Sequence, residues 1–418
     1  MEQFVRESTL MKETTDIQDP NYDVLTEGLL HKVMVFFHIP HTWNNFQVAF
    51  IGLLISGLVS LAWYRKSTPA LVVGAFSVHL LFFLLDSIML KNLPKKQLSF
   101  GPWQSQLAAL TVPRVLVSAI LALIMMAVTS RIGLILLIAV QLIGTAAFYY
   151  GAYVEPFQLD LTELLMFTDR LPVGLPAMRI LHITDLHIER WTRREDDVLR
   201  IVNETKPDMI VISGDYVNLS YNKDPETQRL VHQLLNQLSA PFGVYATLGS
   251  PPVDLRENIL PVFEELDIKL MRNGWEVVDF GDGRQLVLLG MDCTHHIPTD
   301  EARLAHLMSQ SPNHLPQLFV YHSPELMPQA AAQGIDLYLC GHTHGGQVRL
   351  PIIGPLLTSS QLGRRFVMGH YRLGRTHLYV SRGIGLEGMS APRVRFMSPP
   401  EMTLVIMMPG GAVEEKSV

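Results

Sequence analysis

The sequence predicts an α-helical membrane region followed by an α/β domain, and two observations carry this prediction. Of the 418 residues, 48% are hydrophobic, and much of this apolar content falls between about residues 46 and 150. From Met178 onward, short apolar runs rich in β-branched residues alternate with amphipathic helical patterns. That alternation is typical of α/β domains.

The membrane prediction rests on four apolar stretches between residues 46 and 150. Each has close to the roughly 20 residues that a helix needs to cross the hydrocarbon core of a bilayer. The stretches have almost no polar face, which argues against a bundle of buried soluble helices. They cover residues 46–64, 69–90, 112–129 and 132–150. We therefore expect about four transmembrane helices in a multi-pass protein, preceded over residues 1–45 by an acidic tail and a short interfacial segment.

The Lys and Arg residues that flank these stretches predict the orientation, because cytoplasmic loops carry an excess of positive charge. One side of the membrane would carry Lys32, Lys91, Lys95, Lys96 and Arg114, and the other Arg65, Lys66 and Arg131. With four spans, the first side also carries the tail and the C-terminal domain. We therefore expect the C-terminal domain in the cytoplasm. The formal net charge of -6 gives no reason to expect a nucleic-acid partner.

Three prolines break up short apolar runs over residues 151–177, which we interpret as a linker. The α/β domain is expected over residues 178–408, with a tail over 409–418. The predicted strands cover residues 179–184, 209–213, 244–248, 285–289, 318–321, 337–340, 377–381 and 402–407. The predicted helices cover residues 194–204, 225–238, 256–266, 300–310 and 324–333.

Polar side chains follow four of the predicted strands, which is where α/β domains place their binding groups. In extended backbone, residues i and i+2 point the same way, so an Asp-x-His or His-x-His pair can face one ion. Carboxylates and imidazoles are common ligands of divalent metals. The candidate ligands are Asp185, His187, Asp215, His322, His342 and His344. Six ligands are too many for one tetrahedral site, so we expect two ions with Asp215 shared between them.

Two cations held in this way favour phosphate-ester hydrolysis. They polarise a phosphoryl oxygen, clamp the attacking and leaving oxygens in line, and lower the pKa of a bridging water. A metal-bridging hydroxide can then attack phosphorus near neutral pH.

The motifs Asp185-x-His187, Gly214-Asp215, His322 and Gly341-His342-Thr343-His344 resemble those of the calcineurin-like metallophosphoesterase superfamily. The run from Gly341 to Gln347, Gly-His-Thr-His-Gly-Gly-Gln, is similar to the membrane-associated branch. That branch includes bacterial cell-envelope phosphoesterases and transmembrane proteins with a metallophosphoesterase domain. The resemblance covers about residues 178–408.

The resemblance implies a fold, a metal content and a ligand set. The fold would be two mixed β-sheets sandwiched between helices, and the ions would be two divalent metals, with Mn, Fe or Zn expected. Asp215 would bridge the two ions. The first ion would also be held by Asp185, His187 and His344, and the second by His322 and His342.

One departure from the family pattern concerns proton transfer. The family has Gly-Asn-His-Asp after its third strand, where Asn is a ligand of the second metal and His acts on the leaving group. Here Ser250, Pro251 and Pro252 stand in place of Asn-His-Asp. A serine hydroxyl is a poorer ligand, and Pro251 can donate no proton; removing one positioned proton donor costs typically about 10²–10⁴-fold in rate. Ser250 and Asp254 are the weaker candidates for metal ligands. Asp254, or His295 and His296 from a later loop, are the candidate replacements for the missing family residues.

Two hypotheses follow from the sequence. The first is an integral-membrane phosphoesterase that hydrolyses a phosphodiester or a lipid-linked phosphate, with activity reduced or altered by Pro251. Its substrate would be amphiphilic, because the membrane spans hold the domain near lipid headgroups. The alternative is a catalytically lapsed relative that binds metal or a phosphorylated ligand as a sensor or scaffold.

Overall fold

The computed structural model describes residues 23–64, 69–125, 130–390 and 392–410, and it divides into two compact units. One unit comprises Met1–Gly28, Pro156–Leu386 and Met397–Val418, and the other comprises Leu29–Glu155 and Glu387–Phe396. Most of the predicted acidic tail, most of the C-terminal tail, and both Arg65 and Lys66 lie outside the described residues.

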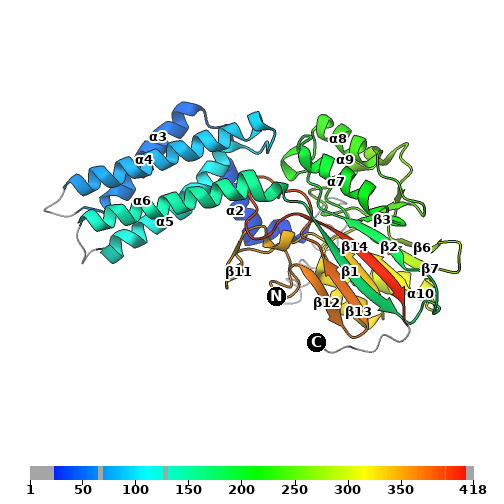
Figure 1. Cartoon of the computed structure of the whole chain (residues 1–418). Helices are drawn as coiled ribbons and strands as arrows, with labels where there is room; N and C mark the ends of the chain where they lie inside the picture. The colour runs from blue at the N-terminus through cyan, green and yellow to red at the C-terminus, as the bar shows by residue number, and fades with distance from the viewer. Residues whose placement is uncertain (1–22, 65–68, 126–129, 391, 411–418) are drawn as a thin grey trace, which may run out of the picture. The chain divides into compact units, whose positions relative to one another are not determined.

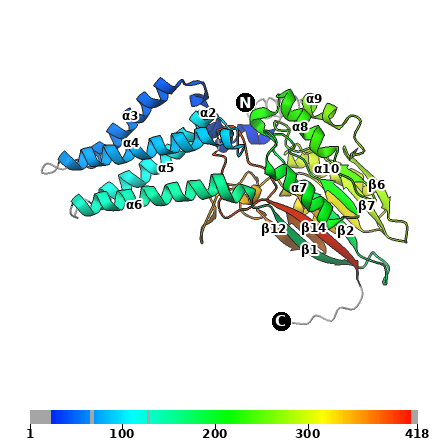
Figure 2. The same ribbon diagram turned by 45° about the horizontal axis from the view of Figure 1, so that its top comes forward.

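The described residues of the helical unit form one short α-helix and four longer ones, of which α4, α5 and α6 lie side by side (Figures 1 and 2). The helices are α2 (Leu29–His38), α3 (Asn45–Leu61), α4 (Pro69–Asn92), α5 (Trp103–Ile124) and α6 (Ser130–Tyr149). Three helical segments, Pro69–Lys96, Trp103–Ile124 and Ile132–Phe157, are long and apolar enough to cross a membrane. The helix α3 is also apolar but has only 17 residues. Among the described residues, three helical segments are thus long enough to cross a membrane, whereas the sequence predicts about four.

One arginine that we assign to a membrane boundary lies inside a helix instead. Helix α5 begins nine residues before the predicted stretch, so Arg114 falls near its middle. The Arg114 guanidinium donates to Oδ1 of Asp86 at 2.7 Å and to Oε1 of Gln141 at 2.8 Å. Arg114 therefore does not count among the charges at the membrane boundary. The predicted orientation of the protein in the membrane then rests on the lysines and remains a prediction.

The α/β unit contains two six-stranded mixed sheets, as the family resemblance implies. The first sheet has the order β1-β14-β2-β3-β4-β5, and the second has the order β12-β13-β9-β8-β7-β6. Within them, β2 to β5 are parallel, and so are β7, β8, β9 and β13.

The strands of the first sheet are β1 (Asp160–Thr168), β2 (Met178–Ile183), β3 (Met209–Ile212), β4 (Val244–Ala246), β5 (Lys269–Leu270) and β14 (Glu401–Pro409). Those of the second are β6 (Gly274–Asp279), β7 (Gln285–Gly290), β8 (Gln317–Val320), β9 (Leu337–Cys340), β12 (Gly369–Leu373) and β13 (Thr376–Val380). A separate short hairpin is formed by β10 (Arg349–Leu350) and β11 (Gly354–Pro355).

Alternation of side chains along the strands builds three apolar layers. In β3, Met209 and Val211 pack in the layer between the two sheets, whereas Ile210 and Ile212 pack against helices outside the first sheet. Because every residue of β3 is buried, the strand is apolar throughout rather than alternating, as expected of a central parallel strand.

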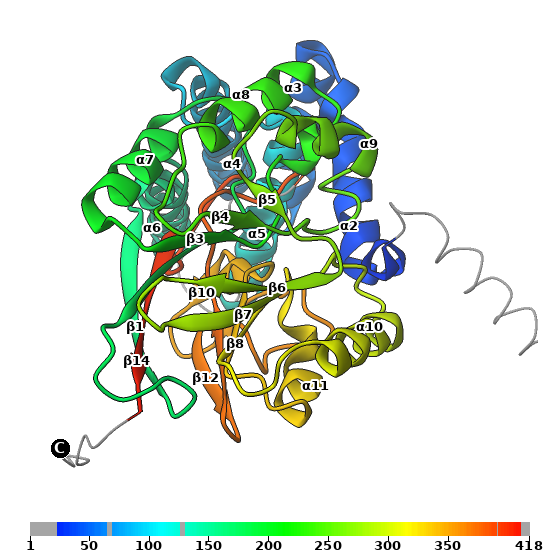
Figure 3. The same cartoon turned by 90° about the vertical axis from the view of Figure 1, so that its right-hand side faces the viewer.

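Figure 3 shows helices on both outer faces of this pair of sheets. The first sheet is covered by α7 (Arg193–Thr205) and α8 (Pro225–Leu235), and the second by α10 (Ile297–Gln310) and α11 (Met327–Ala332).

The predicted linker over residues 151–177 contains a strand of the first sheet. Strand β1 pairs in parallel with β14 over nine residues, from Asp160–Glu401 to Thr168–Pro409. The prolines that suggest a linker flank the strand on either side and leave its backbone free to pair. The edge strand β1 lacks the alternation of apolar and polar residues that marks a half-exposed strand, because its exposed positions include Leu161, Leu165 and Phe167. Likewise, the predicted helix over 256–266 is interrupted at Pro261, where α9 (Arg256–Ile259) gives way to a 3-10 turn.

Candidate metal centre

The six predicted ligands lie close together, in loops at the carboxyl ends of four strands. Strands β2 and β3 are neighbours in the first sheet, and β8 and β9 are neighbours in the second. Since the strands of each pair are parallel, their carboxyl ends meet at one edge of the sheet. All six side chains are buried.

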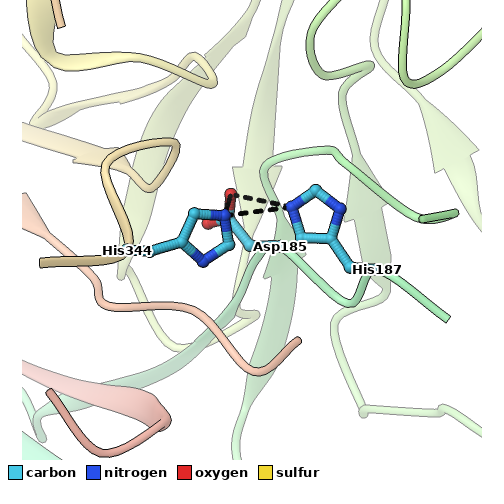
Figure 4. A group of neighbouring side chains, drawn as sticks. All are labelled: Asp185, His187 and His344. Carbon is cyan, nitrogen blue, oxygen red and sulfur yellow. Dashed lines mark hydrogen bonds and ion pairs between the residues drawn. The ribbon is translucent and has the colours of Figure 1, made fainter. Parts of the chain in front are cut away.

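The first cluster consists of Asp185, His187 and His344 (Figure 4). The Nε2 atoms of the two histidines lie 3.0 Å apart, and Nε2 of His344 lies 3.6 Å from Oδ1 of Asp185. Two neutral imidazoles cannot direct lone pairs at each other at this distance without a proton or a cation between them. Ligand atoms around one tetrahedral zinc ion, bound at about 2.1 Å, are roughly 3.4 Å apart, so these separations fit a divalent ion.

The second cluster consists of Asp215, His322 and His342. The Nδ1 atom of His322 lies 2.9 Å from the backbone oxygen of Ser213. If Nδ1 carries the proton and donates it there, the lone pair of Nε2 is free for a metal. That Nε2 is buried, lies 3.1 Å from Oδ2 of Asp215, and makes no hydrogen bond within the described part of the chain. A buried imidazole nitrogen of this kind, beside a carboxylate, is well placed to bind a metal ion together with that carboxylate.

Asp215 lies between the two clusters. Its Oδ2 is 3.6 Å from Nε2 of His187 in the first cluster and 3.1 Å from Nε2 of His322 in the second. One carboxylate therefore lies near ligand atoms of both clusters, and its bridging of two ions stays a prediction. The donor set of carboxylates and imidazoles suits Mn, Fe and Zn.

The backbone at these ligands is strained. Non-glycine residues rarely adopt positive φ, and doing so costs on the order of 1–3 kcal/mol each. Five of the six ligands have positive φ: Asp185 (52°), His187 (41°), Asp215 (58°), His342 (70°) and His344 (50°). Strain of this kind clusters at functional sites, where the surrounding structure enforces it.

Asp215 and His322 in the second cluster shift each other's pKa. Burial by itself would raise the pKa of the Asp215 carboxyl, but the adjacent His322 holds that pKa below its usual range. Burial would lower the pKa of His322, yet the same contact raises it to about 10. The negative charge of Asp215 thus favours a positive charge at Nε2 of His322, either a proton or a divalent cation.

Asp254 and Ser250, the weaker ligand candidates, contribute differently. Oδ2 of Asp254 accepts hydrogen bonds from the backbone N–H of Asp215 at 2.9 Å and of Gly249 at 2.7 Å, and its Oδ1 accepts from that of Tyr216 at 3.0 Å. Asp254 therefore ties the loop after β3 to the turn after β4 and positions Asp215. The backbone N–H of Ser250 donates to Oδ1 of Asp215 at 2.7 Å.

The proline at the family's proton-donor position is buried in the same turn. Pro251 follows Ser250 directly and carries no group that could donate a proton. Of the two histidines considered as replacements, His295 reaches the cluster, with Nε2 at 3.3 Å from Oγ of Ser250. His296 belongs to none of the ligand clusters among the described residues, and its Nδ1 is hydrogen-bonded to Thr299 at 2.7 Å.

Two acidic residues near the site escape the sequence analysis. Asp23, which caps a short 3-10 helix (Val24–Glu27), is buried, and its Oδ2 lies 3.8 Å from Nε2 of His295. Glu325 is also buried, with Oε2 at 3.7 Å from Nδ1 of His295. Asp23 lies in an acidic stretch, so the sequence does not distinguish it from the other acidic residues nearby. Glu325 follows His322 by three residues, and that proximity is the one signal that could have found it.

The comparisons with known proteins agree with this geometry. Residues 178–346 match the model of the family described as calcineurin-like phosphoesterase. A metallophosphoesterase of Bacillus subtilis, YkuE, is 30% identical over 265 residues, which cover 61% of this chain and 87% of that protein. The phosphodiesterase YaeI of Escherichia coli is 28% identical over 277 residues, covering 64% of this chain and 95% of YaeI.

A third relative carries a substrate in its name. The UDP-2,3-diacylglucosamine pyrophosphatase LpxG of Chlamydia muridarum is 23% identical over 316 residues, covering 61% of this chain and 91% of LpxG. Strand-end ligands, two mixed sheets and a relative at 30% identity lead to the same result: the chain belongs to the calcineurin-like metallophosphoesterase family.

Proposed function

We propose that this protein is an integral-membrane, metal-dependent phosphoesterase. The observation that carries the proposal is the pair of buried ligand clusters with the Asp215 carboxylate between them. Phosphoester hydrolysis is the chemistry that such a pair of sites supports best. The assignment of Asp185, His187, Asp215 and His344 to a first ion, and of Asp215, His322 and His342 to a second, is part of this proposal.

Each part of the chain has a separate task in the proposed reaction. Divalent ions, with Mn, Fe or Zn expected, would polarise the phosphoryl group and supply a hydroxide nucleophile near neutral pH. The six ligands hold the ions in place, and the carbonyl of Ser213 orients His322. Asp254 holds the two loops that aim Asp215.

The loss of the proton donor at Pro251 restricts the substrate. Without a positioned acid, the leaving oxygen departs with its negative charge unneutralised. The rate should therefore fall steeply as the pKa of the leaving alcohol rises. We expect aryl phosphodiesters to be hydrolysed much faster than alkyl phosphodiesters.

The substrate we propose is an amphiphilic phosphate ester, such as a phosphodiester or lipid-linked phosphate that carries acyl chains. Three apolar helices on the same chain support this proposal, since a tethered domain is confined near lipid headgroups. The relative LpxG is named for a substrate with two acyl groups. We propose a multi-pass protein with its phosphoesterase domain in the cytoplasm, which Lys32 in α2 and the lysines around the end of α4 support.

The test uses the full-length protein in detergent, with bis(p-nitrophenyl) phosphate and with a diacyl phosphodiester. Mn, Fe, Zn and Co are supplied in turn. We expect metal-dependent hydrolysis that Asp215→Asn abolishes and that Asp267→Asn, a change to an exposed carboxylate, leaves intact. Hydrolysis no faster than that of Asp215→Asn with every metal would refute the proposal.

Pro251 also favours a second candidate function, a metal- or phospholigand-binding protein without catalysis. The triple variant Ser250→Asn/Pro251→His/Pro252→Asp restores the family sequence and separates the two readings. If the natural protein is inactive and the triple variant active, the second function is correct. A natural protein that turns over at a rate the triple variant does not raise excludes it.

A further inference from the structure

The second metal site has an unfilled position in the turn after β4. At this position the family supplies an asparagine, whereas here the side chain is the shorter Ser250. Oγ of Ser250 lies 3.5 Å from Oδ2 of Asp215 and 3.4 Å from Nδ1 of His342. The serine thus stands beside two ligands of the second ion, but its side chain is one heavy atom shorter than that needed to present an amide oxygen.

A histidine from another loop approaches this same point. His295 lies in the loop between β7 and α10, and its Nε2 is 3.3 Å from Oγ of Ser250. Its ring is fully buried, with its centroid 4.4 Å from that of His342. Strand β7 is parallel to β8 and adjacent to it, so this loop also follows a carboxyl end at the edge of the sheet that carries His322. His295 therefore occupies the position of a strand-end ligand.

The backbone of His295 shares the strain of the predicted ligands. Its φ is 55°, and it is one of six site residues among the fourteen non-glycine residues with positive φ in the described part of the chain. Its carbonyl accepts a hydrogen bond from Nε2 of Gln361 at 2.6 Å, which holds the loop in this conformation. A strained, buried and anchored histidine beside two ligand histidines is a built feature rather than a surface accident.

A carboxylate stands behind the ring. Nδ1 of His295 lies 3.7 Å from Oε2 of Glu325, and both atoms are buried without a hydrogen-bond partner among the described residues. Glu325 is itself held by the backbone N–H of Gln361, which donates to Oε1 at 3.1 Å. A carboxylate next to the outer nitrogen of a metal-bound histidine is a recurrent arrangement that fixes the ring and strengthens it as a ligand.

We propose that His295 is a ligand of the second metal ion and takes the place of the family's asparagine, with Glu325 orienting its ring. This inference rests on the proposed two-metal site and adds a seventh protein ligand, from a strand end that the family motifs do not use. The second ion would then be held by Asp215, His322, His342 and His295.

The test measures metal binding rather than turnover. Full-length protein in detergent is stripped with a chelator, reloaded with Mn(II), and assayed for metal content and for the electron paramagnetic resonance of a coupled Mn pair. The natural protein should bind two Mn per chain and show the coupled signal. In His295→Ala, one equivalent should bind at least about 10- to 100-fold more weakly, with the coupled signal replaced by that of an isolated ion.

Three further variants test the interpretation. His296→Ala, which removes the neighbouring histidine, should keep both ions and the coupled signal. Ser250→Asn added to His295→Ala supplies the family's amide and should return the second ion, which also shows that the protein with His295→Ala is folded. Glu325→Gln should weaken the second equivalent by about 10-fold or more while leaving the first unchanged.

One result overturns the inference, namely that His295→Ala retains two tightly bound Mn ions and the coupled signal. That result leaves the proposed function untouched, because Asp215-dependent hydrolysis can persist with the six other ligands. Conversely, a natural protein that loads two Mn ions but hydrolyses no phosphodiester refutes the proposed function and leaves the role of His295 standing.

Discussion

Asp254 offers the sharpest test of how the site is held together. Its carboxylate accepts three backbone N–H groups, from Asp215, Tyr216 and Gly249, at 2.7–3.0 Å, and it is fully buried. These three hydrogen bonds join the loop after β3 to the turn after β4. The substitution Asp254→Ala leaves all three donors without a partner, and no other acceptor to these groups is present among the described contacts.

The expected loss of stability follows from this count. An unsatisfied buried hydrogen-bonding group costs about 1–3 kcal/mol, so three cost at least about 3 kcal/mol. Water that enters the vacated space and relief of the repulsion between Asp254 and Asp215 keep the loss toward the lower part of the range. In a domain of this size, 1 kcal/mol shifts Tm by about 2–4 °C, so Asp254→Ala should lower Tm by at least roughly 6 °C. Asp254→Asn keeps one acceptor oxygen and should lose less.

The assay is thermal unfolding of the detergent-solubilised, metal-free protein, followed by Mn(II) titration. Because Asp254 positions Asp215, both Asp254 variants should also bind metal more weakly. Asp267→Ala, at an exposed position, is the control and should change Tm by less than about 1 °C. If Asp254→Ala melts within 1 °C of the natural protein, the three hydrogen bonds do not hold the site and the reasoning fails.

Three further predictions concern pH, backbone space and the membrane helices. Burial lowers the pKa of His182 to about 3, so between pH 6.5 and pH 3 the folded state binds fewer protons than the unfolded state. The free energy of unfolding should therefore decrease by up to about 5 kcal/mol as the pH is lowered through this range. Melting of metal-free protein from pH 7 to pH 4 should be flatter for His182→Asn, and equal slopes would contradict this. Gly383 has φ of 65°, and an added Cβ would lie 2.5 Å from Cβ of Asp185. Gly383→Ala should therefore weaken Mn(II) binding at the first site, and full retention of both ions would show that the loop can yield. Arg114→Met leaves the Asp86 carboxylate buried without its partner and should destabilise the helical unit by about 3–5 kcal/mol, whereas the double variant with Asp86→Leu should recover most of that loss. A double variant that melts no higher than Arg114→Met would refute the pairing.

The strand-end motifs were readable because they depend on local rules. A parallel strand buried on both faces is a short apolar run, and the polar residues directly after it must lie at the sheet edge. For this reason the sequence alone places Asp185, Asp215, His322 and His342 near one another. The central strands β2, β3, β8 and β9 agree with their predicted positions to within a residue.

The edge strands and the interrupted helix were not readable in this way. Strand β1 has one solvent-exposed face and lies between prolines, so its partner β14, more than 230 residues later, decides that it is a strand at all. For a related reason, the sequence pattern puts Arg114 at a membrane boundary although it lies inside α5. The apolar pattern marks where a stretch is most hydrophobic, but the bidentate pair with Asp86 lets α5 continue through a charged residue.

The sequence by itself determined the family, the six ligand candidates, the apolar helices and the missing proton donor, because each is written in neighbouring residues. Only the tertiary structure decided what surrounds those ligands. Asp254 joins two loops through its hydrogen bonds. His295, Glu325 and Asp23 come together from segments up to about 300 residues apart in the chain. Spacing along the chain carries no information about such contacts, since they depend on which loops the two sheets bring to the same edge.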